Sequence, residues 1–233
     1  MSYRGCVKRP SKILAASGLM ALLSGPLLAD KIEDSIARDF PKFSIFKKTM
    51  GDLNGDGIVD YALILWATNS KKAPLVVYFG DNKGAFHLQS SSQLAICVGC
   101  GGPKAIMGEP LGDLNINAKG ILLITCLGGS REVWIDVLKW RFDKKQKEFL
   151  LIGETYRSVD NFREEPTERT DINYSTGKIE NSIGKKRRVC QFVTSSIKLT
   201  SFDFANNHLD DLDRITNGCS TVRQPGPEQT KHK

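Results

Sequence analysis

The chain has 233 residues, of which 40% are hydrophobic and 25% charged. The hydrophobic fraction is enough for a buried core. The length allows one large β domain or two small ones. The formal charge of +7 suggests nucleic-acid binding, but four positive charges lie within the first twelve residues. Without them the charge is +3, so no nucleic-acid partner is expected.

The N-terminal segment 1–29 has the pattern of a secretory signal peptide. Four basic residues and no acid precede an apolar stretch, 13–28, and the segment ends in Leu27-Leu28-Ala29. We expect cleavage after Ala29. A membrane anchor is the alternative, but the stretch only approaches the lower length limit for a spanning helix. No cysteine lies at the cleavage point to carry a lipid. The expected product is a periplasmic or secreted protein without a stable membrane anchor.

Export changes the meaning of the cysteines, because an oxidising compartment favours disulfides. We expect a local disulfide between Cys97 and Cys100, since Gly101-Gly102-Pro103 favours a loop there. Zinc is not expected, because no second Cys-x-x-Cys or paired histidines complete a tetrahedral set. Cys190 and Cys219 form a second candidate pair. The odd count of five leaves one thiol over, and the connectivity of the five, which include Cys126, stays open.

A short amphipathic helix is expected over residues 31–40. Ile32, Ile36 and Phe40 fall four residues apart and share one face. Pro41 ends the helix. Its expected role is to cap the sheet that follows.

An acidic loop comes next. Asp52, Asn54, Asp56 and Asp60 occupy loop positions 1, 3, 5 and 9, with Gly57 at position 6. This alternation directs side-chain oxygens at one hard cation, and glycine permits the sharp turn.

The sequence therefore predicts a Ca2+ site that also uses the backbone carbonyl of Ile58 at position 7. An EF-hand is rejected, because position 12 is Leu63 rather than a bidentate glutamate. An ordinary turn without an ion is the alternative. The mutual repulsion of three carboxylates argues against that alternative.

Short apolar runs separated by turn residues dominate the rest of the chain. Expected strands cover residues 61–66, 75–79, 85–88, 120–127, 133–142, 148–158, 170–174, 178–182 and 188–194. Residues 97–112 and 161–168 are expected to be loops. The predicted fold is all-β, mainly an antiparallel meander, either propeller-blade-like or a sandwich, with one short N-terminal helix. The expected domains are the signal peptide (1–29), a β domain (30–205) and a polar, disordered tail (206–233).

The loop pattern Asp-x-Asn-x-Asp-Gly-x-x-Asp, followed by a strand and by Val77-Tyr78-Phe79-Gly80-Asp81-Asn82-Lys83-Gly84-Ala85-Phe86, resembles an FG-GAP/VCBS-type repeat. That repeat is the blade unit of integrin-like β-propellers. The resemblance covers about residues 50–90 and implies calcium ligation by Asp52, Asn54, Asp56, Ile58 and Asp60. The rest resembles, more loosely, small exported bacterial proteins of unknown function with one such repeat.

A second copy of the repeat is doubtful. Gly112-Asp113-Leu114-Asn115 repeats Gly51-Asp52-Leu53-Asn54, but the late carboxylate and turn glycine are replaced by Ile121 and Ala118. The segment 113–121 is either a degenerate repeat or a chance match. The chain is also too short for several further blades.

Catalytic candidates are few. Asp160, Glu164, Glu165 and Glu168 offer paired carboxylates for a glycosidase, but a solvated loop is the commoner outcome. His87 is expected to meet solvent. Trp134 and Trp140 share a strand face, as a sugar-stacking platform or as core residues. The basic run 185–188 is interpreted as a solvated turn.

We therefore expect an exported calcium-binding β module, a non-enzymatic binding or structural protein of the cell envelope with a protein or glycan ligand. The alternative is an exported carboxylate-dependent hydrolase acting on envelope glycans.

Overall fold

The computed structural model describes residues 25–205, apart from positions 69, 71, 97, 99–110, 161, 163–165 and 185. The predicted signal peptide lies mostly outside these residues, and the polar tail, Cys97, Cys100 and Cys219 lie wholly outside them. Those expectations stay predictions. In the described part of the chain, no helix is long and apolar enough to cross a membrane.

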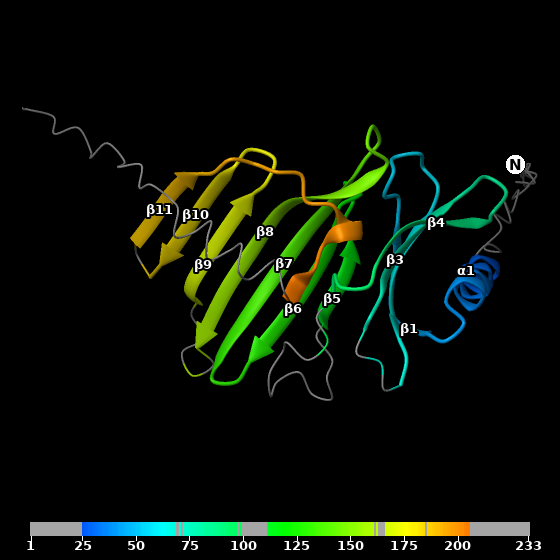
Figure 1. Cartoon of the computed structure of the whole chain (residues 1–233), viewed down its shortest axis with the longest axis horizontal. Coiled ribbons are helices and arrows are strands. Elements are labelled where there is room, and N and C mark those ends of the chain that lie inside the picture. Colours follow the sequence, from blue (N-terminus) through cyan, green and yellow to red (C-terminus); the bar gives the residue numbers. More distant parts are fainter. Residues whose placement is uncertain are drawn as a thin grey trace, which may run out of the picture.

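One helix and two sheets make up the described chain (Figure 1). The helix α1 spans Gly25–Asp39. The first sheet contains β1 (Ser44–Gly51), β2 (Asp60–Trp66), β3 (Leu75–Gly80) and β4 (Phe86–Ser92). The second contains β5 (Leu111–Ile116), β6 (Leu122–Gly129), β7 (Glu132–Asp143), β8 (Glu148–Asp160), β9 (Pro166–Asn173), β10 (Lys178–Ile183) and β11 (Lys186–Gln191). A 3-10 turn follows at Leu199–Ser201.

Both sheets are antiparallel meanders, in which each strand pairs with its neighbours in sequence. The sheets have four and seven strands. The predicted all-β fold with one helix is therefore confirmed.

Strand β2 explains the layering, because its side chains are buried on both faces. Ala62 and Ile64 belong to the large core that the two sheets share. Leu63 and Leu65 point the other way and pack with α1. A near-continuous apolar run is the usual composition of a strand covered on both sides. In Figure 1, α1 accordingly lies on the side of the small sheet away from the large one.

Helix α1 covers the small sheet with one apolar stripe, as predicted. Ile32 and Ile36 are buried at 0% and 3% exposure. At the end of the helix, the Tyr78 hydroxyl donates a 2.8 Å hydrogen bond to Asp39. The helix begins at Gly25, earlier than expected, so it spans the predicted cleavage position.

The C-terminal strap (residues 197–204) joins the two sheets. The Leu151 N–H of β8 donates to the Ile197 carbonyl, and the Phe204 N–H donates to the Leu94 carbonyl just beyond β4. Phe202 packs edge-on against Trp140 of β7, with ring centroids 5.1 Å apart. The strap crosses the face of the large sheet in orange in Figure 1.

The strands differ from the expected ones in four places. Strand β11 begins at Lys186, inside the basic run 185–188 that is expected as a turn, because it pairs with β10. Strand β1 was not predicted, because two adjacent lysines and a register shift between Ile45 and Lys47 break its alternation. Strand β5 falls largely within the expected 97–112 loop and the GDLN echo, and its Gly, Asp and Asn are turn formers. Strand β9 begins at Pro166, inside the expected 161–168 loop, because it pairs with β8. Tertiary pairing overrides local propensity in these strands.

Only part of the cysteine expectation falls within the described residues. Cys126 is a free, buried cysteine. Burial raises the pKa of its thiol, and the negative charges of Asp136 and Glu154 raise it further. Cys190 is disulfide-bonded. Its predicted pairing with Cys219 lies outside the described residues.

Phe202→Ala should destabilise the protein by about 3 kcal/mol or more, since it removes a buried aromatic side chain of the strap that packs against Trp140 and Phe204. Urea unfolding would measure the change. Val193→Ala is the matched control, because Val193 is 95% exposed, and its effect should stay within about 0.5 kcal/mol. Equal midpoints for the two variants would contradict the joining role of the strap.

Candidate metal centre

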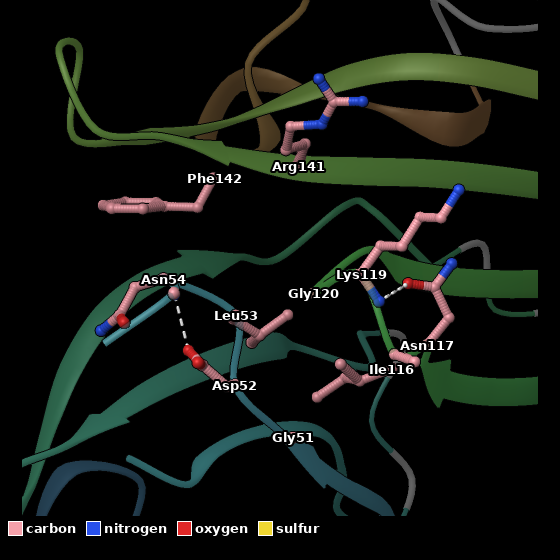
Figure 2. A pocket seen from close by; sticks show the side chains of 12 residues that line it. Gly51, Asp52, Leu53, Asn54, Ile116, Asn117, Lys119, Gly120, Arg141 and Phe142 are labelled. Atoms are coloured by element: carbon pink, nitrogen blue, oxygen red, sulfur yellow. Dashed lines mark hydrogen bonds between the residues drawn. The ribbon is translucent and has the colours of Figure 1, made fainter. Parts of the chain in front are cut away.

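The acidic loop (residues 52–59) joins β1 to β2 beside the turn between β5 and β6. Figure 2 shows Asp52 and Asn54 on one side of a hollow and Asn117 and Lys119 on the other. Gly55 and Gly57 have φ values of +73° and +81°. Glycine adopts such left-handed backbone without steric cost, so the sharp turn expected at Gly57 is present.

Asp52 organises the loop by accepting three backbone hydrogen bonds. Its Oδ1 accepts from Gly55 N at 2.6 Å and from Asp56 N at 3.2 Å, and its Oδ2 accepts from Gly57 N at 2.9 Å. Burial alone would raise the pKa of Asp52, but these N–H groups outweigh it and hold the pKa below its usual value. Asp52 is therefore ionised at neutral pH.

Asn54 and Asp56 contact each other above this turn. Asn54 Nδ2 donates to Asp56 Oδ2, and Asp56 N donates to Asn54 Oδ1, both at 2.9 Å. Ile58 joins the network through its N–H, which donates to Asp56 Oδ1 at 2.8 Å. The Asp56 side chain is exposed, so it remains open to an ion from solvent.

Asp60 lies beneath the loop and is fully buried. Its Oδ2 accepts from Leu53 N at 2.8 Å, and its Oδ1 accepts from Gly80 N at 3.1 Å. Burial raises the pKa of Asp60 to about 6; the two N–H bonds partly offset this, and the charge of Asp56 adds to it. Asp60 thus fastens the start of β2 to the loop and to β3.

Gly80 permits this close contact. A Cβ at Gly80 would lie 2.4 Å from the Val59 carbonyl oxygen and 3.1 Å from Ile58 Cγ2. Any larger residue would push the loop away from β3. This contact gives a structural reason for the glycine in Phe79-Gly80.

The predicted ligands share one loop, but their side chains have separate roles. Across the described residues, no group of three or more His, Cys, Asp or Glu side chains is placed to hold a metal ion. Asp52, Asn54 and Asp56 cluster around the turn, whereas both oxygens of Asp60 face backbone N–H groups. A carboxylate oxygen that accepts one N–H keeps a second lone pair, so Asp52 and Asp56 can add a cation while retaining the turn. Calcium ligation by the five positions stays a prediction.

A pocket of about 540 Å³ adjoins the loop. Besides Asp52 and Asn54 it is lined by Asn117, Lys119 and Arg141, which come from the large sheet. Gly120 allows the β5–β6 turn to approach, since a Cβ there would lie 2.6 Å from the Asp52 carbonyl oxygen. Sequence reasoning missed these lining residues.

The GDLN echo does not form a second loop. Asp113 and Asn115 lie within strand β5, where they pair with Thr125 and Leu123 of β6. The turn that follows is organised instead by Asn117, whose Oδ1 accepts from Lys119 N at 2.9 Å and from Ile121 N at 3.1 Å. The two echoing segments nonetheless meet, because Gly51 lies against Ile116.

The other candidate residues have structural surroundings where they are described. Trp140 is fully buried and Trp134 stacks on Phe204, so the pair belongs to the core and is not a sugar platform. His87 is exposed, as expected, and lies 3.0 Å from Asp81.

Of the four carboxylates proposed for a hydrolase, Glu164 and Glu165 lie outside the described residues. Asp160 accepts a hydrogen bond from Phe162 N, and Glu168 accepts one from Asn181. Both described carboxylates are therefore engaged in local structure.

Gly80→Ala should destabilise the protein by about 1–3 kcal/mol, because the added methyl overlaps the Val59 carbonyl. Urea unfolding would measure the loss. Lys83→Ala, in the exposed turn after β3, is the control and should change stability by no more than about 0.5 kcal/mol. A neutral Gly80→Ala would show that the loop does not need this close approach.

Asp60 should make stability depend on pH in the presence of a chelator. Its pKa of about 6 in the folded state lies above the ordinary aspartate pKa of 3.8. The folded state therefore holds the Asp60 proton more tightly than the unfolded state does. The resulting contribution to the free energy of unfolding is complete below pH 3.8 and is lost as the pH rises through about 6. The loss amounts to at most about 3 kcal/mol. The difference in unfolding free energy between wild type and Asp60→Asn should show this slope, and parallel curves from pH 4 to 7 would contradict it.

Comparison with protein-family models, with curated proteins and with solved structures finds no match for this chain. The FG-GAP/VCBS resemblance therefore stays an expectation based on residues 50–90. Function has to be argued from the loop and its surroundings.

Proposed function

We propose that the protein is an exported β module stabilised by Ca2+, which acts by binding a protein or glycan ligand rather than by catalysis. The observation that carries the proposal is the acidic loop: Asp52, Asn54 and Asp56 gather their oxygens around one glycine turn. Such oxygen-rich loops suit hard cations.

The position of the loop supports a stabilising role for the ion. Leu53, within the loop, is 4% exposed and belongs to the core that both sheets share. Asp60 fastens the same loop to β3, and Gly120 brings the large sheet against it. A cation at the loop would hold the turn at the place where the two sheets meet.

Extracellular or periplasmic localisation is part of the proposal. The disulfide at Cys190 supports an oxidising compartment, where such bonds persist. Extracellular modules bind calcium with dissociation constants of roughly 0.1–1 mM, which suits a permanently occupied structural ion.

The hydrolase alternative has less support. Asp160 and Glu168 are held in local hydrogen bonds. Screening of the full chain on glycan substrates separates the two roles, and turnover abolished by Glu165→Gln would favour the hydrolase.

Calcium at about ten times its dissociation constant should stabilise the protein by roughly 1.4 kcal/mol, because it binds only the folded loop. For a protein of this size that raises Tm by roughly 3–5 °C. Asp56→Asn should abolish most of the shift in Tm, because it removes the charge of one calcium ligand. The asparagine keeps a side-chain oxygen that can accept the hydrogen bond from Ile58 N. Differential scanning calorimetry in calcium and in chelator would measure both.

Asp113→Asn is the matched control, because Asp113 occupies the equivalent place in the GDLN echo but lies exposed on β5. Its calcium shift should equal that of wild type. Identical melting curves of the wild-type protein in calcium and in chelator would refute the calcium proposal.

A further inference from the structure

The outer face of the large sheet, which points away from the shared core, contains a hollow of about 500 Å³. Gly153 lies at the base of the hollow, between its pairing partners Lys139 of β7 and Asn173 of β9. Because Gly153 has no side chain, the space above it stays empty. A Cβ at Gly153 would lie 3.4 Å from Lys139 Cδ. The volume falls within the usual range of ligand sites.

Basic side chains surround this hollow. Alternation along the paired strands places six of them on the face that also carries Asp171 and Glu180. Glu154 lines the hollow too, but its side chain is fully buried and accepts a 2.9 Å hydrogen bond from the Tyr174 hydroxyl. The basic residues are Lys139, Arg141, Arg157, Arg169, Lys178 and Arg187.

Asp171 and Glu180 both form ion pairs with basic side chains of the same face. Asp171 pairs with Arg169 at 2.6 Å and accepts from Thr155 at 2.8 Å. Glu180 pairs with Lys178 and with Arg187. Burial raises the pKa of Asp171, but Arg169, Thr155 and the nearby charge of Lys139 outweigh it and lower that pKa. Lys178 and Arg187 lower the pKa of Glu180.

Basic groups remain after this pairing. In the described part of the chain, no acidic group lies within ion-pair distance of Lys139 or Arg141. Lys139 Nζ donates to Thr155 Oγ1 at 2.8 Å, which holds it at the rim of the hollow. Arg157 stands directly opposite Arg169 on the neighbouring strand. Like charges in that position are destabilising, and Asp171 offsets this only at Arg169.

We infer that this outer face binds an acidic glycan, through carboxylate or sulfate groups held by Lys139, Arg141 and Lys178. Asn173 and Ser175 also line the hollow and can exchange hydrogen bonds with sugar hydroxyls. Arg141 lines this hollow and also the pocket beside the acidic loop. The inference rests on the proposed binding role but does not depend on calcium.

Two other polyanions fit less well. A membrane surface calls for apolar side chains that insert, and the large apolar side chains exposed in the described residues, such as Met50, Leu88 and Phe162, lie elsewhere. Single-stranded nucleic acid calls for aromatic side chains on which bases stack. The lining of the hollow includes none.

Binding of hyaluronan and of chondroitin sulfate oligosaccharides to the full chain, measured by titration calorimetry in calcium and again in chelator, tests the inference. The two polymers distinguish carboxylate from sulfate recognition, and neutral dextran is the reference. We expect at least tenfold tighter binding of one acidic polymer than of dextran, weakening as salt rises. Arg141→Gln with Lys178→Gln should lower that affinity at least tenfold.

Lys83→Gln, exposed on the other sheet, is the matched control for lost positive charge and should bind like wild type. The affinity of the wild-type chain should be the same in calcium and in chelator, so failure of the calcium proposal and failure of this one are distinguishable. Equal affinity of the double variant and wild type, or no binding of either acidic polymer, would overturn the inference. Preferential binding to phosphatidylglycerol vesicles or to single-stranded DNA would also overturn it.

Discussion

Burial of strand β2 on both faces is the constraint on which the rest of the structure depends. Its side chains alternate between the core shared by the sheets and the contact with α1. A strand of this composition cannot lie at a surface without exposing several large apolar groups. The helix on one side and the seven-stranded sheet on the other both follow from this requirement.

The acidic loop is held in place by the same strand. Asp60 is both the last residue of the predicted ligand pattern and the first residue of β2, where it is fully buried. A buried carboxylate needs hydrogen-bond partners, and the N–H groups of Leu53 and Gly80 supply them. The loop is therefore tied to the sheet at its base, while Asp56 at its tip stays exposed.

The two faces of the large sheet carry different kinds of side chains. The inner face carries Trp140 and Leu138, and it meets the small sheet and the strap. The outer face carries basic side chains around the gap that Gly153 leaves. Since the inner face supplies the core, the outer face can carry charged side chains.

The sequence by itself determined the fold class, the helix over Ile32 and Ile36, and the acidic loop with its turn at Gly57, because these depend on local periodicity and on the backbone freedom of glycine. Only the tertiary structure decided that residues 44–51 and 111–116 form strands, since their polar and turn-forming residues are overruled by pairing with β2 and β6. It also decided that Asp60 faces backbone N–H groups and that residues from two distant segments line one pocket. Such contacts join positions far apart in the chain, so no local pattern encodes them.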